Sequence, residues 1–322
     1  MAATAKPFAS SADVGEKAQT LEELAPGVWA LTAEGDPNVG AIEGEDFLVC
    51  FEALATPVAA RAWLDRLRRH TDKPVRYLVL SHYHAVRVLG AAAFGAPVVV
   101  AHETTKALVA ERGKQDWESE LGRMPRLFAE PDSIPGLTWP TLTFSDRVAI
   151  DLGGDRGEVV VAHCGRGHTE GDAVVWLPSQ GICFAGDLVE AEAALYTGDA
   201  CHQEWATTTL DRVAALSPET LVGGRGGVVR GRQQVGAAIA QTRHFLQVLL
   251  DRVGGVRQRG GTRREAFAEA HRALEPDYGR WPIFEHCLPF DVARVWDELA
   301  GVDRPEIWTA ARDREVWAEL QG

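Results

Sequence analysis

Short apolar runs alternate with helical patterns and with turns rich in glycine or proline up to about residue 230, and this alternation constrains the fold more than any other feature. The runs at 47–51 and 75–80 are rich in β-branched and aromatic residues and are expected to form buried strands. Between them, Thr56 and Pro57 provide a cap and a first-turn proline for a helix with apolar residues at helical spacing. Such a chain forms a layered α/β domain.

The pattern becomes helical near residue 233. Apolar residues recur every three or four positions from Val235 to Val253, and three further helical patterns follow. The first residues of the chain lack such periodicity and are expected to form a flexible tail. The predicted organisation is a tail over 1–21, an α/β domain over 22–232 and a helical extension over 233–322.

Two segments are candidates to cover a site. The helix that begins near residue 103 is expected to end after about ten residues at Gly113. Residues 115–140 then combine prolines, polar residues and aromatic rings, which predicts a long structured loop over a cleft. The aromatic segment 281–290 either folds over the same cleft as a wall or packs between the two domains.

The composition narrows the possible partners. The 322 residues include 33 Lys and Arg against 46 Asp and Glu, a formal net charge of −13, which matches neither nucleic acid nor an anionic membrane. The 5 cysteines contain no C-x-x-C pair, and no apolar run reaches the ~18 residues of a membrane span. We therefore expect a cytoplasmic protein that binds a small molecule, with no nucleic acid or membrane partner, and a homodimer formed through the helical extension.

Three strand-end loops carry groups that can bind a metal. His82 and His84 follow the strand at 75–80 and, being two residues apart in an extended segment, point the same way. His168 lies in a glycine-rich loop, and Asp187 follows another apolar strand. The structural alternatives are buried histidines that only form hydrogen bonds and an Asp187 that only pairs with Arg87.

These segments resemble the metallo-β-lactamase-fold metallohydrolases. The matching motifs stand in the family's order across about residues 22–231. They are the opening segment at 24–31, the H-x-H loop at 82–84, the Gly-His-Thr loop at 167–169, the Gly-Asp-Leu turn at 186–188 and the glycine-rich segment at 222–226. The resemblance implies a four-layer αβ/βα sandwich with a metal site along one edge. It also implies that His82, His84 and His168 hold the first metal and that Asp187 matches the carboxylate that bridges two metals.

The chain departs from the family pattern where a second metal would bind. Val86 replaces an aspartate, Arg87 replaces a histidine, and Arg225 replaces a later histidine. Three imidazoles with Asp187 or water as a fourth ligand suit one Zn²⁺, and fixed cations disfavour a second ion. The arginines could instead hold Asp187 or bind an anionic group of the substrate.

The resulting expectation is a mononuclear zinc hydrolase acting on a small ester, lactone or thioester, with Asp187, Arg87 and Arg225 as catalytic residues. Because Val86 cannot orient a nucleophile, a base has to come from Asp187, Glu190 or Glu192. Two alternatives remain open. One is a mononuclear iron oxidoreductase of the same fold, in which two histidines and a carboxylate hold the iron. The other is a binding protein with a decayed site.

Overall fold

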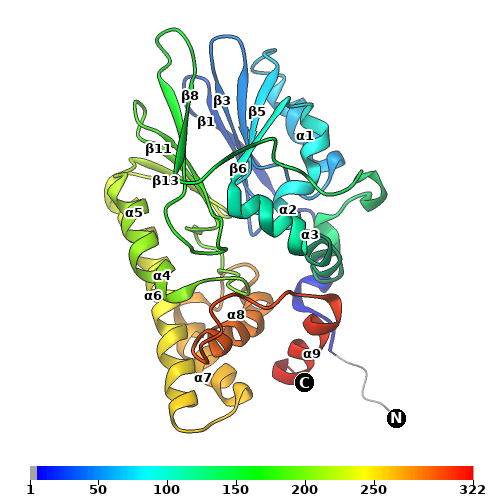
Figure 1. Cartoon of the computed structure of the whole chain (residues 1–322), viewed down its shortest axis with the longest axis vertical. Helices are drawn as coiled ribbons and strands as arrows, with labels where there is room; N and C mark the ends of the chain where they lie inside the picture. The colour runs from blue at the N-terminus through cyan, green and yellow to red at the C-terminus, as the bar shows by residue number, and fades with distance from the viewer. Residues whose placement is uncertain (1–5, 322) are drawn as a thin grey trace.

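Two sheets pack face to face, with helices on their outer faces, in the computed structural model of the chain, which describes residues 6–321 (Figure 1). The first sheet contains, in spatial order, β1 (Gln19–Ala25), β2 (Val28–Ala33), β3 (Val39–Glu43), β4 (Leu48–Phe51), β5 (Val75–Val79), β6 (Val98–His102) and β7 (Leu142–Phe144). The second contains β13 (Val229–Arg230), β12 (Thr220–Gly223), β11 (Ile182–Gly186), β10 (Val174–Leu177), β9 (Glu158–Ala162) and β8 (Arg147–Asp151). Both sheets are mixed, since β4 to β7 run parallel in the first and β11 and β12 run parallel in the second.

The helices fall into two groups. Those of the sandwich are α1 (Pro57–Leu67), α2 (Ala85–Val88), α3 (Glu103–Arg123), α4 (His202–Glu204) and α5 (Leu210–Ala215). Those of the C-terminal part are α6 (Arg232–Gln258), α7 (Arg263–Tyr278), α8 (Phe284–Glu298) and α9 (Ala310–Gln321). Short 3₁₀ turns lie at 9–12, 89–94, 125–127 and 131–133, and a π turn spans 205–209.

Local sequence explains why the first helix begins where it does. The Thr56 hydroxyl accepts a hydrogen bond from the Ala59 amide at 3.2 Å, and Pro57 occupies the first turn, as the sequence predicts. Trp63 on the inner face of α1 is buried against the first sheet. The predicted α/β sandwich with C-terminal helices is confirmed.

The C-terminal helices share a core with the second sheet. Phe245 of α6 and Val292 of α8 belong to the same buried cluster as Val174 and Leu221 of the sheet. The helical pattern begins at Arg232, next to the boundary expected from the sequence. Because this core is continuous across that boundary, the division into separate domains stays a prediction.

The prediction that α3 ends at Gly113 is wrong, because the helix continues to Arg123. Its inner face beyond Gly113 is buried but polar, so the apolar periodicity that marks a helix in the sequence is interrupted. The polar residues buried on α3 beyond its first turn are Arg112, Asp116, Ser119, Glu120 and Arg123. The loop expected over 115–140 therefore starts only after α3.

The N-terminal segment also differs from its prediction. Residues 1–5 of the expected flexible tail lie outside the described residues, whereas residues 6–21 contain a 3₁₀ turn and the start of β1. The Phe8 ring packs 5.3 Å from the Trp317 ring of α9, since an aromatic side chain gains by leaving water. This contact joins the start of the described chain to its last helix.

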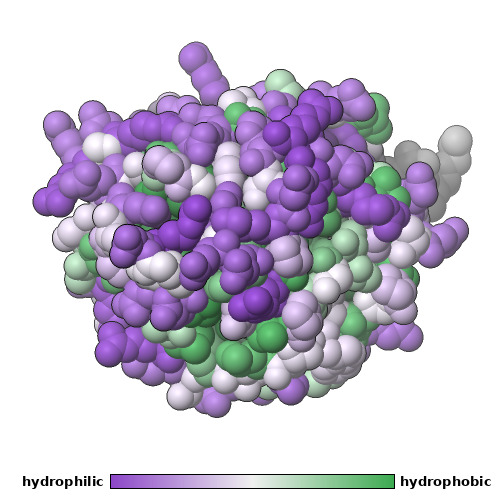
Figure 2. Space-filling view, turned by 90° about the horizontal axis from the view of Figure 1, so that it is seen from above, coloured by the Kyte–Doolittle hydropathy of each residue, from purple (hydrophilic) through white to green (hydrophobic). Residues whose placement is uncertain are grey.

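The outer surface is mainly polar where it can be seen from the top of Figure 1, with smaller apolar areas between the polar groups (Figure 2). Within residues 6–321, no helix is both long enough and apolar enough to cross a membrane.

Candidate metal centre

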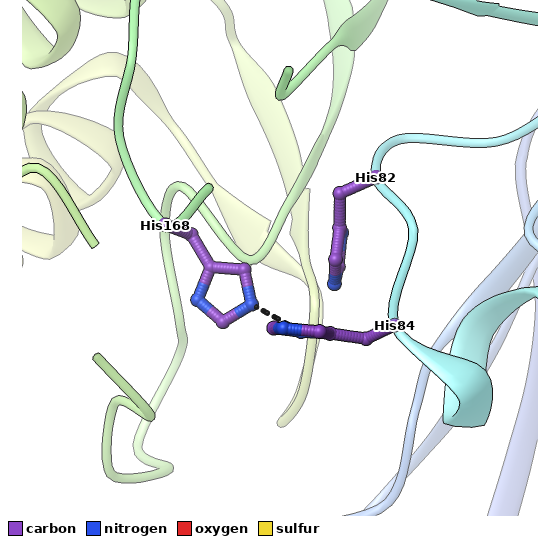
Figure 3. A group of neighbouring side chains, drawn as sticks. All are labelled: His82, His84 and His168. Carbon is purple, nitrogen blue, oxygen red and sulfur yellow. Dashed lines mark hydrogen bonds between the residues drawn. The ribbon is translucent and has the colours of Figure 1, made fainter. Parts of the chain in front are cut away.

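The three histidines proposed as metal ligands point toward one another (Figure 3), and they come from loops at one edge of the sandwich. His82 and His84 lie between β5 and α2, His168 lies between β9 and β10, Asp187 follows β11, and Arg225 comes soon after β12. Ligand sites in α/β sheets form where strands end, because the loops there are free to vary while the strands fix their starting points. α8 lies beside this edge, with α7 farther from the sandwich in the view of Figure 1.

The three imidazole rings form a compact buried group. Their centroids lie 4.8 Å apart for His82 and His84, 4.6 Å for His82 and His168, and 4.8 Å for His84 and His168. Each residue is at most 2% exposed, and one nitrogen from each ring lies within 4.8 Å of the other two. The sequence prediction that these rings converge is therefore confirmed.

In each ring, one nitrogen bonds to a group outside the histidine cluster, and the other nitrogen faces the other two rings. The Nδ1 atom of His82 lies 2.7 Å from the Ser81 hydroxyl, and the Nδ1 atom of His168 donates to the Tyr196 carbonyl at 2.8 Å. The Nε2 atom of His84 lies 3.0 Å from the Asp199 carboxylate.

The inward nitrogens form a ligand set for one ion. The Nε2 atom of His82 has no hydrogen-bond partner among the described residues, and His84 Nδ1 lies 3.0 Å from His168 Nε2. Partners on the outer nitrogens are the arrangement that fixes ring orientation in metal sites. The residues present therefore fit a metal held by three imidazoles.

The protonation of the rings follows from their surroundings. Burial lowers the pKa of His168 to about 3 and lowers the pKa of His82 well below its usual value. Burial acts in the same direction on His84, but the carboxylates of Asp116, Asp199 and Glu120 outweigh it and raise its pKa to about 9. Since a metal binds neutral imidazole, metal binding has to displace a proton from His84.

Asp187 lies between the histidines and two arginines. Its Oδ2 atom is 3.5 Å from His168 Nε2 and 3.9 Å from His82 Nε2, and the same atom accepts a hydrogen bond from Arg225 at 3.0 Å. Arg87 binds the other carboxylate oxygen and also donates to the Gly224 carbonyl at 2.8 Å. Burial alone would raise the pKa of Asp187, but the two guanidinium groups outweigh it and hold that pKa well below its usual range.

The proposed base residues differ in their surroundings. Glu190 is buried and accepts a hydrogen bond from Arg225 at 2.9 Å, and burial together with the charge of Asp187 raises its pKa to about 8. Glu192 is exposed and does not line the cavity beside the histidines. The Val86 side chain packs in the apolar core, and its amide donates to Glu120 at 2.8 Å.

Sequence reasoning missed the carboxylates that surround His84. Asp116 accepts a hydrogen bond from the Ala85 amide at 2.7 Å, and Asp199 accepts one from the Tyr83 hydroxyl. The interval of four between Asp116 and Glu120 on α3 is the helical spacing that could have revealed a polar inner face.

These carboxylates also form a second candidate ligand group. Suitable atoms of His84, Asp116 and Asp199 lie within 4.8 Å of one another. Arg112 lies 3.5 Å from the Asp199 carboxylate, so a fixed cation already balances part of this negative charge. Among the described residues, no arginine hydrogen-bonds to the inward nitrogens of the three-histidine group, and Arg87 and Arg225 bind Asp187 beside them.

A narrow cavity adjoins the histidines. Its free volume of about 10 Å³ is the space of about one water molecule, and its walls include His84, His168 and Asp187. Ile283, His286 and Cys287 form part of the wall, whereas Phe284 and Phe290 of the same segment pack in buried clusters. The two interpretations of segment 281–290, a wall over the cleft and packing in the core, therefore both describe part of it. Of residues 115–140, the predicted covering loop, Glu120, Arg123 and Met124 line the cavity, and all three lie in or directly after the last turn of α3.

Residues 32–225 of the chain match the Metallo-beta-lactamase superfamily. The chain belongs to this superfamily. The metallo-beta-lactamase type 2 of Bacillus sp. (strain 170) is 26% identical over 200 residues, which are 59% of this chain and 68% of that protein. The family and the general class, a metallohydrolase with a histidine-rich site, are thus confirmed.

Two solved structures show how far the fold extends. A metallo-beta-lactamase from Pontibacter korlensis has a TM-score of 0.57 and 21% identity, with 71% of this chain and 99% of that chain covered. A double mutant of the sec-alkyl sulfatase PisA1 has a TM-score of 0.69 and 20% identity, with 88% of this chain and 50% of that chain covered. Since the residues before α6 make up less than 88% of the chain, the fold shared with PisA1 extends into the C-terminal helices.

Proposed function

We propose that the protein is a mononuclear zinc hydrolase that acts on a small ester, lactone or thioester. The observation that carries this proposal is the inward-facing set of three imidazole nitrogens, with every ring fixed from outside by Ser81, Asp199 or the Tyr196 carbonyl. Three nitrogen ligands with a fourth open position are the usual donor set of catalytic zinc sites. His82, His84 and His168 would hold the ion, and Asp187 lies close enough to complete the set.

The two arginines favour one ion over two. Both guanidinium groups bind the carboxylate that would otherwise bridge two metals, and both are buried. A unit charge about 4 Å from a like charge costs about 4 kcal/mol at an effective dielectric constant of about 20, and a divalent ion doubles this cost. Arg87 and Arg225 therefore take the place of a second ion electrostatically.

Zinc bound here would polarise an ester oxygen and make water a nucleophile at neutral pH. Asp187 remains ionised and holds the two arginines, which in turn balance negative charge on a reacting group. Glu190, whose pKa is raised by burial and by the charge of Asp187, lies beside Arg225 and is the candidate proton donor. The narrow cavity limits the amount of water that can compete with the substrate.

The fold shared with PisA1 adds one substrate class to the proposal. The name of that protein says that it is a sec-alkyl sulfatase, and its likeness extends into the C-terminal helices. Alkyl sulfate esters therefore belong in the substrate panel together with carboxylic esters.

The test is hydrolysis by protein that has been stripped of metal and then loaded with one equivalent of zinc. The panel is an aryl acetate, a lactone, a thioester and an alkyl sulfate, and at least one should be turned over by the zinc-loaded protein only. His168→Ala should abolish this turnover, whereas His244→Ala, which changes a histidine on α6, should not. No zinc-dependent turnover of any substrate would contradict the proposal. If the purified protein contained iron and consumed oxygen, the alternative of a mononuclear iron oxidoreductase would be favoured. If it bound no metal, the alternative of a binding protein with a decayed site would be favoured.

A further inference from the structure

Two side chains from outside the family's metal-binding loops form part of the cavity wall. Arg123 is the last residue of α3, and His286 lies in the first turn of α8. Both line the cavity together with His84 and His168, and each is only 1% exposed. Neither residue belongs to the ligand groups described above.

The nitrogens of these two side chains are incompletely bonded. Both ring nitrogens of His286 and the Nη1 atom of Arg123 have no hydrogen-bond partner among the described residues. Buried polar atoms without partners are rare in folded proteins. The Arg123 nitrogen is a donor, a neutral His286 ring offers one donor and one acceptor, and the Tyr196 hydroxyl on the same wall is also without a partner, which together indicate a ligand that bonds to them. The Nε atom of Arg123 donates to the Ser119 hydroxyl at 3.2 Å. The Arg123 guanidinium also lies over the Phe290 ring at 4.7 Å, and the His286 ring packs 5.6 Å from the same ring.

The charges around the cavity show which kind of ligand fits. Asp187 and Glu120 are the carboxylates on its wall, and Arg123 and Arg225 are the guanidinium groups. Asp187 is already bound by two arginines, and Glu120 accepts a hydrogen bond from the Val86 amide.

Arg123 lacks such a close partner. Its closest ion pair places the Nε atom 3.7 Å from Asp313. Its positive charge is therefore only partly balanced, and a divalent ion on the three histidines would add two more positive charges to the same cavity. An anion is the ligand that balances both.

We propose that the cavity binds the oxyanion group of a small ligand, a carboxylate or a sulfate, through Arg123 and His286. The guanidinium group donates to one oxygen, and the neutral imidazole donates to another. The free volume of about 10 Å³ is the space of about one water molecule, so the anion enters only when the side chains of the wall move apart, and a small anion or the charged end of a substrate requires the least movement. Its role as a substrate-binding subsite rests on the proposed function, but binding of the anion does not require turnover.

The experiment is calorimetric titration of formate and of sulfate into metal-free and zinc-loaded protein. At least one anion should bind, more tightly when zinc is present. His286→Phe should weaken the binding at least about tenfold, which is the effect of losing one hydrogen bond to a charged group. His271→Phe is the matched control, since His271 lies on α7 and pairs with Glu285 away from the cavity, and it should bind as the unmodified protein does.

Two further measurements separate binding from folding. His286→Phe should keep its thermal unfolding temperature, because the new ring packs against Phe290 and Trp317, which already surround the imidazole. His286→Gln, which keeps a donor, should recover part of the affinity. The ring ¹⁵N resonances of His286 should shift on addition of the anion that binds.

The proposal is overturned if neither anion binds, or if the anion binds equally well to His286→Phe. Preference for formate assigns the site to a carboxylate, and preference for sulfate assigns it to a sulfate group. Binding that depends on His286 in a protein without zinc-dependent turnover would leave this proposal standing while the proposed function fails. Zinc-dependent turnover without such binding would leave the proposed function standing while this proposal fails.

Discussion

Replacing Asp187 by Asn tests how strongly this carboxylate balances the two buried arginines. Asp187 is 3% exposed at its side chain, Arg87 is fully buried, and Arg225 is 4% exposed. The substitution keeps the size of the side chain and removes only its charge. In the metal-free protein it leaves both guanidinium groups without their shared anionic partner.

The expected cost is about 3 kcal/mol of unfolding free energy. Removing one partner of a buried ion pair costs about 3–5 kcal/mol, because the other charge stays buried. The low end applies here since Arg225 keeps Glu190 at 2.9 Å and Arg87 keeps the Gly224 carbonyl at 2.8 Å. Loss of the Asp187 charge also removes one cause of the raised pKa of Glu190, so that Glu190 ionises more readily and compensates further.

The assay is urea unfolding followed by tryptophan fluorescence in the presence of a chelator. Asp211→Asn is the matched control, because Asp211 pairs with Arg243 at 2.7 Å but is 71% exposed at its side chain. That variant should lose less than about 1 kcal/mol. If Asp187→Asn lost no more than this control, the view that Asp187 stabilises two buried cations would be refuted.

Three further predictions concern the surroundings of the site. Asp199→Asn weakens the hydrogen bond to the outer nitrogen of His84 and should therefore lower the affinity for zinc about 10- to 100-fold, as measured in competition with a chelator. The combined substitutions Val86→Asp and Arg87→His should raise the bound metal above one ion per chain, as measured by elemental analysis. If the folded double variant still bound one ion, Val86 and Arg87 would not be the residues that exclude a second ion. Burial would raise the pKa of Glu298, but hydrogen bonds that include those from His202 lower it from 4.5 to about 2. Because the pKa of Glu298 is lower in the folded protein than in the unfolded chain, ionised Glu298 stabilises the fold above about pH 4.5, and this contribution is lost as the pH falls toward 2. The loss is roughly 3 kcal/mol, and acid unfolding of Glu298→Gln should lack it.

The sequence predicts what depends on local pattern. The strand before His82, the cap of α1 at Thr56 and the convergence of the three histidines follow from alternation, capping and strand-end position, and the structure confirms them. These features can be predicted from residues that are neighbours in the sequence or from the order in which the family's motifs follow one another.

What the sequence did not predict depends on polar burial. α3 passes Gly113 because its inner face is held by charged groups such as Asp116 and Glu120, which accept hydrogen bonds from the backbone amides at the start of α2. Hydrophobic periodicity has no means of detecting such a face. Asp199 was missed for the same reason, since its partner His84 is 115 residues away in the chain and a lone acidic residue in a loop is usually solvated.

The position of His286 shows a third limit. The aromatic segment around it indicated either a wall over the cleft or packing between the domains, and the structure places His286 in the wall. The sequence could not show that the imidazole and Arg123 would meet at one cavity, because α3 and α8 approach each other only through tertiary packing. Cavity-lining residues from distant helices are therefore the part of the site that requires a structure.

The central claim is that three histidines hold a single ion, and anomalous X-ray diffraction at the zinc absorption edge tests it most directly. Crystals of the zinc-loaded protein should show one peak per chain, bonded to His82 Nε2, His84 Nδ1 and His168 Nε2, with Arg87 and Arg225 still on Asp187. Two fully occupied peaks at this edge, or a single peak among His84, Asp116 and Asp199, would contradict the account.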